Sequence, residues 1–306
     1  MKRLTLALTI ILSLSIIFLT ACGGGSSSNG TTDKPSEVSA GESEDTKASE
    51  PSGSESEDTK ASESEPAESD DIKIGSLEDL DGKVIGVQLG TIGDEIASDD
   101  INAKSVERFT TYVDAVTSLK QKKVDCLVID ADTAAAYAEQ NPELVVVDVG
   151  FEPEEYAMAV AKEGSEDLLV AINEVIAELK ANDSIVVFKE AHGGQAGQAP
   201  DFNVGAAGGK LVVGTEPTFP PYEYTQGSDI IGVDIDIMAA VAKKLDMELQ
   251  VENINFDGLI PAVKSGKIQV IAAGMTVNEE RKVNVSFSDP YTDAQQVVLI
   301  RKTSQK

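Results

Sequence analysis

The sequence predicts an α/β protein with two lobes, and three observations support this. Short apolar, β-rich runs alternate with amphipathic helical segments from residue 72 onward. A Gly/Ala-rich stretch interrupts the alternation at 193–209, and the same alternation restarts behind it. About 235 residues are available for folding, which is enough for two cores. Nearly continuous apolar strands between helices are typical of parallel sheets covered on both faces, so we expect two such sheets.

The first 22 residues read as an export signal. Lys2 and Arg3 precede an apolar run, Leu4–Leu19, and "LTAC" closes it at Cys22. A charged segment, an apolar segment and small residues at a cleavage site make up such a signal. The run is short of the ~20 residues that span a bilayer, which disfavours a transmembrane anchor. "LTAC" resembles a lipobox, which implies lipid attachment to Cys22 and anchoring to the outer face of the bacterial cell membrane.

Residues 23–70 are predicted to form a disordered acidic tether. They hold 13 acidic residues against three lysines, and "SEDTKASE" occurs twice. Such a stretch buries too little apolar surface to offset the entropy of ordering. A specific acidic ligand for a partner is the alternative.

The charge of the folded part disfavours nucleic acid and anionic lipid as partners. The chain has a net charge of −28, and about −20 remains without the signal and the tether. A basic patch that binds phosphate groups is therefore not expected. Cys126 in "VDCLVID" reads as a small apolar residue of a buried strand, structural rather than reactive.

Elements before the Gly/Ala-rich stretch follow from the alternation. Ser76-Leu77-Glu78-Asp79 reads as a helix N-terminus, because a Ser cap is followed by acids in the first turn. Residues 165–181 form an amphipathic helix, since Leu168, Ile172, Val175, Ile176 and Leu179 share one face. The predicted strands are Val84–Gln88, Val124–Ile129, Val145–Val149 and Tyr156–Val160, and the other predicted helices are 111–122, 132–139 and 184–190.

Elements behind that stretch repeat the pattern. The predicted strands are Leu211–Thr215, Leu249–Glu252, Ile268–Ala272 and Gln295–Ile300. Helices are expected near 234–245, 257–265 and 278–283. In open α/β sheets ligands bind outside the carboxyl ends of strands, so the residues after these strands are the candidates for a site.

The residues at four strand ends suit a zwitterion. Arg281 offers a guanidinium that binds a carboxylate in two parallel hydrogen bonds, helped by the N–H groups around Thr91 and Ile92. Asp130 pairs with an ammonium, and Thr276 adds a hydroxyl. The remaining candidates are two aromatic residues that flank the ligand and one acid in a turn: Phe219, Phe256 and Glu216.

Each candidate has a structural alternative. Arg281 beside Glu279 and Glu280 is equally consistent with a weak surface ion pair, and Asp130 with a cap of the next helix. The two phenylalanines fit a core, Thr276 and the Gly-containing loops fit ordinary turns, and Glu216 fits a solvated acid. The coincidence of these residues at four strand ends favours a site.

Several motifs resemble a known family. "KLVVGTEPTFPPYEY", "GVDIDIMAAVAKKL", "FDGLIPAVKSGKIQV" and "AGMTVNEERKVNVSFSDPY" resemble the first lobe of the polar amino-acid-binding proteins of ABC importers, which have the type II periplasmic-binding-protein fold. "SLEDLDGKVIGVQLGTIGDEIA" and "YVDAVTSLKQKKVDCLVID" resemble their second lobe. "EEYAMAVAKEGSEDLLVAINEVIAELKAN" resembles the return into lobe one.

The resemblance implies a role for each matching position. Arg281 and the N–H groups of Thr276 and Ile92 bind the α-carboxylate. Asp130, the Gly274 carbonyl and the Thr276 hydroxyl bind the α-ammonium, and Phe219 and Phe256 enclose the ligand's stem. Glu216 and Gln88 choose the side chain, and the acid favours Arg, Lys or another polar amino acid. Ile92 stands where the family often has a small or hydroxylated residue, so only its backbone contact is expected.

The order of the motifs implies a circular permutation, because the family's chain begins with lobe one. The expected parts are lobe two at 72–156, the C-terminal helices of lobe one at 157–192, a joining segment at 193–209 and the main part of lobe one at 210–302. The new chain ends are then expected in one of the two crossings between lobes, which leaves only the crossing near Tyr156 covalent.

The expected function is that of a non-catalytic receptor, which delivers a free L-amino acid to ABC permease subunits and needs no cofactor or metal. The alternatives are a dehydratase-like enzyme on the same scaffold, with Glu216 as acid, and a sensor subunit. His192 lies beside the soft segment, which disfavours His-based catalysis.

Overall fold

The computed structural model describes residues 73–194, 197–200 and 207–302. The predicted export signal, Cys22 and the acidic tether lie outside these residues, as do positions 195–196 and 201–206 of the predicted joining segment. The fold below is that of the unit Glu65–Lys306. Within the described residues, no helix is both long and apolar enough to span a bilayer.

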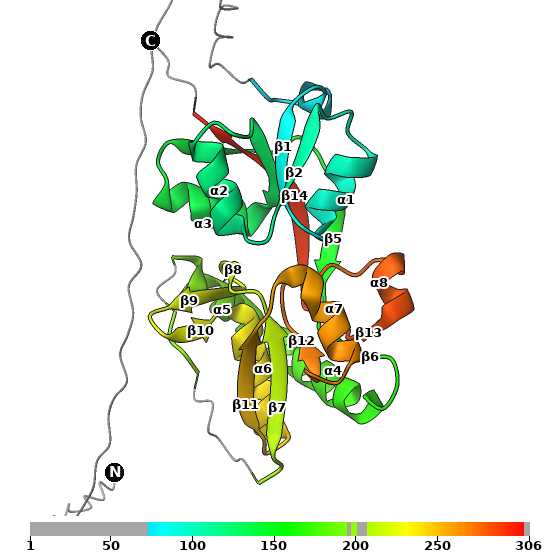
Figure 1. Ribbon diagram of the computed structural model, residues 1–306. Coiled ribbons are helices and arrows are strands. Elements are labelled where there is room, and N and C mark those ends of the chain that lie inside the picture. Colours follow the sequence, from blue (N-terminus) through cyan, green and yellow to red (C-terminus); the bar gives the residue numbers. More distant parts are fainter. Residues whose placement is uncertain (1–72, 195–196, 201–206, 303–306) are drawn as a thin grey trace, which may run out of the picture. The chain divides into compact units, whose positions relative to one another are not determined.

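Lobe two, which we define as residues 73–156 and 292–302, is built on a mixed sheet with the strand order β2-β1-β3-β14-β4 (Figure 1). Its strands are β1 (Val84–Gln88), β2 (Ser105–Phe109), β3 (Cys126–Asp130), β4 (Leu144–Val147), β5 (Pro153–Tyr156) and β14 (Thr292–Arg301). Its helices are α1 (Ile92–Asp99), α2 (Tyr112–Lys120), α3 (Ala131–Gln140) and the short 3-10 helix Leu77–Leu80. Strands β2, β1 and β3 run parallel, whereas β14 is antiparallel to β3 and β4.

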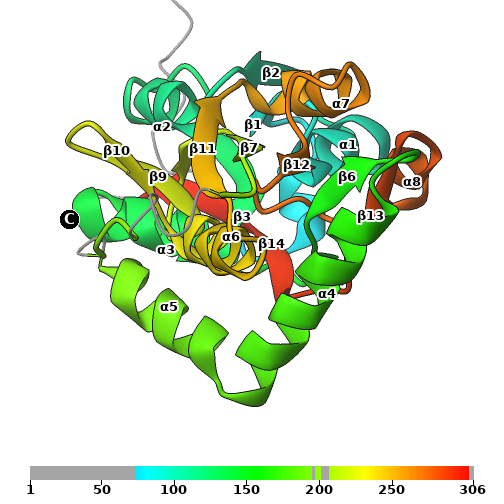
Figure 2. The same cartoon turned by 90° about the horizontal axis from the view of Figure 1, so that it is seen from below.

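Lobe one, residues 157–194 and 207–291, has a second sheet with the order β11-β7-β12-β6-β13 and a small sheet, β10-β9-β8. Its strands are β6 (Ala159–Ala161), β7 (Lys210–Thr215), β8 (Thr218–Phe219), β9 (Glu223–Gln226), β10 (Asp229–Ile231), β11 (Glu248–Asn253), β12 (Val270–Ile271) and β13 (Val285–Phe287). Its helices are α4 (Glu166–Ala181), α5 (Ser184–Gly193), α6 (Val233–Lys244), α7 (Phe256–Lys264) and α8 (Glu279–Asn284). Figure 2 shows α4 and α5 beside α6, which both of them contact.

The mixed α/β fold is confirmed, but the sheets are not all-parallel. In each sheet one strand runs against its neighbours: β14 in lobe two and β6 in lobe one. Both of these strands arrive directly from the other lobe, so they enter the sheet from the end that faces that lobe. The direction of entry explains why the apolar pattern alone did not reveal their orientation.

The predicted elements are present with bounds shifted by a few residues, and the differences have local causes. The predicted strand 156–160 is two strands, β5 and β6, because the chain passes between the lobes at residues 157–158. The edge strand β2 was missed because "SVERF" alternates poorly and is only partly buried. Strands β8 to β10 and β13 were missed because they are short.

Residues 292–301 belong to lobe two, which corrects the predicted extent of lobe one to residue 302. The apolar side chains of Val297, Val298, Leu299 and Ile300 are buried, and β14 lies between β3 and β4. The chain therefore crosses between the lobes twice, at 157–158 and at 288–291. The expectation that one crossing is broken is wrong, because β14 is long enough to continue from its crossing to the far end of the lobe two sheet.

A buried aromatic cluster lies where the two lobes meet. Tyr156 stands at the end of β5, with ring-centroid distances of 5.1 Å to Tyr222, 6.1 Å to Phe219 and 6.4 Å to Tyr291. Tyr112 of lobe two stacks on Phe219 at 5.8 Å. Aromatic rings bury large areas, so this cluster holds the strand ends of both lobes in a fixed relation.

Cys126 and His192 are both buried. Burial raises the pKa of the Cys126 thiol to about 12, which agrees with a structural role. The ring nitrogens of His192 lie 3.0 Å from the Tyr224 hydroxyl and 2.9 Å from an Asp236 carboxylate oxygen. His192 thus joins α5 to β9 and α6 at the lobe one surface, and it does not line the pocket described next.

Candidate functional site

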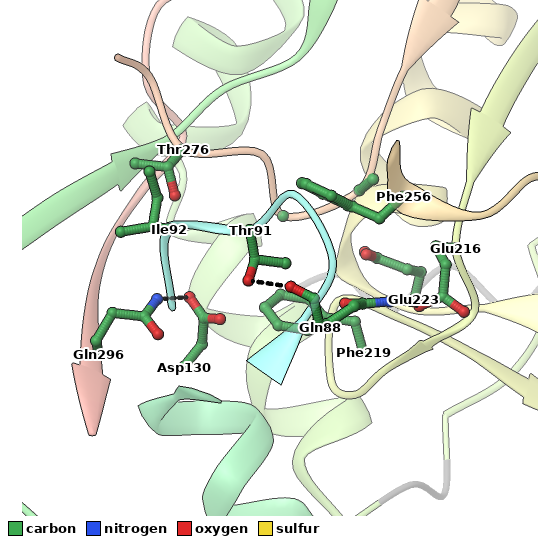
Figure 3. Close-up of a pocket in the computed structure, with 12 residues that line it drawn as sticks. Gln88, Thr91, Ile92, Asp130, Glu216, Phe219, Glu223, Phe256, Thr276 and Gln296 are labelled. Carbon is green, nitrogen blue, oxygen red and sulfur yellow. Dashed lines mark hydrogen bonds between the residues drawn. The ribbon is translucent and has the colours of Figure 1, made fainter. Parts of the chain in front are cut away.

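A narrow pocket lies between the two lobes, near the carboxyl ends of β1, β3 and β7 (Figure 3). It is lined by Gln88, Thr91, Ile92, Asp130, Glu216, Phe219, Glu223, Phe256, Ala273, Gly274, Thr276 and Gln296. Nine of the ten predicted site residues are among them, and Arg281 is the exception. The lining includes three carboxyl groups and no Lys or Arg.

Asp130 is the last residue of β3, and its carboxylate accepts hydrogen bonds from residues around the pocket. Oδ1 accepts from the Tyr156 hydroxyl and, at 2.8 Å, from Gln296 Nε2. Oδ2 lies 3.4 Å from the Tyr112 hydroxyl. Asp130 stands at the N-cap position of α3 but makes no side-chain cap bond, so the alternative that it merely caps this helix is wrong. Burial, then the nearby charge of Glu154, raises the pKa of Asp130 to about 7.

A second acid, Glu154 of β5, stands next to Asp130 and was not predicted. Gln296 Nε2 donates to both carboxylates, at 2.8 Å to Asp130 and 2.7 Å to Glu154. The Thr276 hydroxyl of lobe one donates to Glu154 Oε2 at 2.5 Å. This bond joins the two lobes, and it engages the hydroxyl that the sequence assigned to the ligand.

Glu216 follows β7 and is buried, which rules out a solvated loop acid. Its Oε2 accepts from the Thr218 hydroxyl at 2.6 Å and from Gln88 Nε2 at 2.9 Å. Gln88 belongs to lobe two and also donates to the Thr110 carbonyl at 3.0 Å, so Glu216 is tied to the opposite lobe. Burial raises the pKa of Glu216, and these hydrogen bonds partly oppose the shift.

Glu223, the first residue of β9, is a further acid that sequence reasoning missed. Only 1% of its surface is exposed, and Oε2 has no hydrogen-bond partner among the described residues. Burial, followed by the charges of Asp234, Glu216 and Asp130, raises its pKa. In the sequence it appears only as one acid within "FPPYEY", with nothing to separate it from a surface glutamate.

Phe219 serves both the core and the pocket. It stacks on Tyr112 and Tyr222 at 5.8 and 5.6 Å and presents its edge to Gly274. Gly274 has a φ of +50°, and a Cβ there would stand 2.3 Å from Phe219 Cε1. The close approach therefore requires glycine. Phe256, the first residue of α7, lines the opposite wall (Figure 3).

Arg281 lies beside the pocket rather than in its lining. The N-cap Asn278 accepts from its backbone N–H at 2.8 Å and so begins α8 as expected. The guanidinium is 5.4 Å from the Phe256 ring and donates to two carbonyls, Thr276 at 2.8 Å and Gly90 of lobe two at 3.0 Å. Arg281 is 5% exposed, so the surface ion pair is wrong, and Lys282 instead pairs with Glu279.

The α1 end of the site differs from expectation in one respect. The N–H of Thr91 donates to the Gln88 carbonyl at 3.3 Å, so it is not free for an anion. The Thr91 hydroxyl caps α1 by accepting from Asp94 N at 3.3 Å. Thr91 and Ile92 still line the pocket, and the contact of the Ile92 N–H with the ligand's carboxylate stays a prediction.

Comparison with known proteins finds similarity in the last third of the chain. Residues 211–306 match the model of "Bacterial extracellular solute-binding proteins, family 3". An arginine-binding extracellular protein of Bacillus subtilis is 38% identical over 33% of this chain and 41% of its own length. A probable histidine-binding protein of Campylobacter jejuni is 42% identical over 31% and 37%.

The matches cover only part of these proteins. The chain spans about two fifths of the length of the curated relatives it matches. A solved ancestral arginine-binding protein bound to arginine is 51% identical over 27% of this chain and 37% of its own, with a TM-score of 0.27. Over its residues 211–306, the chain is similar to the bacterial extracellular solute-binding proteins, family 3.

Proposed function

We propose that this protein is an exported, non-catalytic receptor that holds a basic amino acid between its two lobes and delivers it to an ABC importer. The observation that carries the proposal is the pocket: three carboxyl groups from both lobes line it, and no cationic side chain does. Burial raises the pKa of all three acids, and a positively charged ligand group beside them would favour their charged form. The arginine- and histidine-binding relatives point to the same ligand class.

The α-ammonium group of the ligand is assigned to Asp130 and Thr276. Both groups have partners in this structure, but Tyr156, Gln296 and Glu154 make neutral or shared hydrogen bonds that an ammonium can replace with charge-assisted ones. Asp130 has a pKa of about 7. An ammonium beside it favours the charged carboxylate, so binding near neutral pH releases protons.

The α-carboxylate is assigned to Arg281. The guanidinium already lies next to Phe256 and Thr276, which line the pocket. Its bonds to the Thr276 and Gly90 carbonyls are single contacts to neutral acceptors. Exchange of one of them for a carboxylate strengthens the interaction, because the guanidinium then meets a full negative charge in two parallel hydrogen bonds instead of one neutral carbonyl. The ligand's cationic side chain then lies toward Glu216 and Glu223.

Capture is proposed to proceed by closure of the lobes. Several hydrogen bonds cross between them, including Gln88 to Glu216, Arg281 to Gly90 and Asn278 to Glu95. Two crossings of the chain, at 157–158 and 288–291, supply the hinge. Anchoring through Cys22, the acidic tether and the circular permutation complete the proposal, and they rest on the sequence.

The dehydratase-like alternative has one observation in its favour, since burial raises the pKa of Glu216 as a proton donor requires. It is distinguished by the outcome for the ligand, because a receptor returns the bound molecule unchanged. Mass spectrometry of a mixture of protein and ligand, before and after incubation, separates the two functions.

Calorimetry with the amino acids tests the receptor. We expect binding of L-arginine or L-lysine and loss of it in Arg281→Ala. Lys282→Ala is the matched control, because Lys282 follows in the same helix but forms a surface ion pair. Undiminished binding by Arg281→Ala would show that the site is misplaced, and equal affinity for L-glutamine would refute the basic specificity.

A further inference from the structure

A second concavity, which we call the lobe two groove, lies beside the pocket. It is bounded by the 3-10 helix Leu77–Leu80, by α1 and by residues 150–154, which include the start of β5. Its apolar side chains are Leu77, Ile92, Ile96, Ile101, Phe151 and Pro153. Concave sites with apolar walls and a few polar groups are typical of small-molecule binding.

The apolar side chains of the groove are not all absorbed by the core of lobe two. Leu77 is 39% exposed, whereas Leu80 of the same turn is fully buried. Ile92, Ile96 and Ile101 are only partly buried. Apolar surface that gathers in one place, unlike single exposed apolar residues, indicates an interaction site.

Acidic residues surround this apolar surface, and they are Glu78, Asp81, Asp100, Glu152 and Glu154. Among the described residues, no Lys or Arg lines the groove. All of these acids except Glu154 are exposed, so the rim attracts a cation while the apolar walls accept a hydrocarbon body. The same charges disfavour an anionic ligand, and they also disfavour the acidic segment 23–70 of this chain as the occupant.

The groove shares two walls with the pocket. Ile92 and Thr276 line both of them, and Figure 3 shows these two residues next to each other at the end of the pocket away from Glu216. Thr276 belongs to lobe one, and its hydroxyl donates to Glu154 at 2.5 Å. The other lining residues belong to lobe two, so the groove is complete only while the lobes are together.

We propose that the lobe two groove is a second ligand site, which binds an amphipathic amine, a molecule with one ammonium group on an apolar body. The ammonium group lies at the acidic rim, and the apolar body lies on Leu77, Ile96 and Ile101. Because the groove is complete only in the closed arrangement, its occupant favours closure and raises the affinity of the pocket for its amino acid. This coupling rests on the proposed function, whereas the groove site itself does not.

Calorimetry with phenylethylamine tests the site, and phenylethanol is the matched probe, because it has the same apolar body without the charge. We expect the amine to bind while saturating L-arginine occupies the pocket. Phenylethanol should bind about 3- to 10-fold more weakly, since exposed ion pairs are individually weak but several acids contribute. Leu77→Ser should weaken both probes, whereas Glu152→Gln should weaken only the amine. Glu155→Gln is the control, because Glu155 is an exposed acid close by in sequence that does not line the groove.

Several outcomes would overturn the groove site. These are a wild type that does not bind the amine, displacement of the amine by arginine, and equal affinity for the two probes. An amine affinity unchanged in both Leu77→Ser and Glu152→Gln, with native folding checked by thermal melting, would do the same.

The reverse titration tests the coupling. Phenylethylamine should raise the affinity for L-arginine by at least about fivefold, the lower end of typical couplings between two sites, and Leu77→Ser should abolish this effect. An unchanged arginine affinity overturns the link between groove and pocket. A wild type that binds no arginine refutes the proposed function, and the amine titrations of the wild type and the variants then decide on the groove alone.

Discussion

Gly274 is the position where a single methyl group tests the geometry of the site most directly. Its φ of +50° is a left-handed conformation, and a Cβ would stand 2.3 Å from Cε1 and 2.8 Å from Cδ1 of Phe219. Phe219 has little room to retreat, because Tyr112 and Tyr222 stack on it at 5.8 and 5.6 Å. The Gly274→Ala variant must therefore strain its own backbone and displace the pocket wall.

The expected loss has two parts. A left-handed backbone costs an L-residue roughly 1–2 kcal/mol, and an extra methylene in a packed core typically costs about 1–3 kcal/mol. We expect Gly274→Ala to lower the free energy of unfolding by about 2–5 kcal/mol in all. The affinity for arginine should fall by at least about tenfold, because Phe219 is part of the pocket lining and an ångström-scale shift of a binding group removes its contacts.

Gly227→Ala is the control that separates the two parts. Gly227 has a φ of +64°, but nothing lies within 4 Å of a Cβ placed there. Urea unfolding of both variants, with arginine calorimetry on each, isolates the contact with Phe219. Equal destabilisation by the two substitutions, with unchanged binding in Gly274→Ala, would refute the close packing of Gly274 against Phe219.

Three further predictions follow from particular contacts. Asp130, with its pKa raised by burial from 3.8 to about 7, binds more protons in the folded than in the unfolded protein between these values, so the free energy of unfolding should fall as the pH rises through this range. Urea unfolding at a series of pH values should show that the free energy of unfolding depends less on pH in Asp130→Asn than in the wild type. Some dependence should remain, because Asp234 has a similar pKa. An unchanged pH dependence would contradict the assignment. The Asp132 carboxylate accepts hydrogen bonds across the lobes from Lys189 at 2.8 Å and from the Tyr222 hydroxyl at 2.6 Å, but its side chain is 44% exposed. Asp132→Asn should therefore lower the free energy of unfolding by less than about 1 kcal/mol. A loss of about 3 kcal/mol or more would show that these contacts act as a buried ion pair. Cys126 is buried with a pKa of about 12, so an aromatic disulfide reagent should label it only after urea unfolding, and rapid labelling of the native protein would count against its placement in β3.

The strand-end argument found most of the pocket because it rests on the geometry of parallel strands. Gln88 and Asp130 end the parallel strands β1 and β3, and Glu216 follows β7. Parallel strands bring their carboxyl ends to one edge of the sheet, so residues far apart in sequence converge there. The same argument could not predict the hydrogen bonds of these side chains, because their partners, such as Gln296 and Thr218, lie on other strands.

The residues that sequence reasoning missed lie on antiparallel strands. Gln296 is near the start of β14, and it faces the pocket because β14 runs opposite to β3, with Gln296 paired to Asp130. Glu154 and Glu223 belong to β5 and β9, which are also antiparallel to their neighbours. On such strands the amino-terminal half reaches the pocket, so a rule based on carboxyl ends passes over it.

The direction of Arg281 could not be predicted for a different reason. Its position in α8 follows from the Asn278 cap, which the sequence contains. A long side chain at the start of a short helix can reach several acceptors, and here backbone carbonyls of both lobes receive it. Carbonyl positions depend on the packing of loops around Gly90 and Thr276, which no periodicity encodes.

The two chain crossings bear on the proposed closure of the lobes. Thr292 to Gln295 of β14 pair with Pro153 to Tyr156 of β5, so the crossings lie together as an antiparallel ribbon beside Tyr156. β14 ends at Arg301, whose guanidinium donates to the Leu119 and Val124 carbonyls. β1 begins at Val84, at the same end of the sheet. Residues 73 and 302 therefore leave lobe two at the strand ends remote from the pocket, where Asp130 and Gln296 stand. Both connections that must bend in the proposed closure are covalent, so the proposed circular permutation leaves the hinge intact. Under the proposed function, differences in affinity between this protein and its relatives should therefore arise from the pocket acids rather than from the hinge.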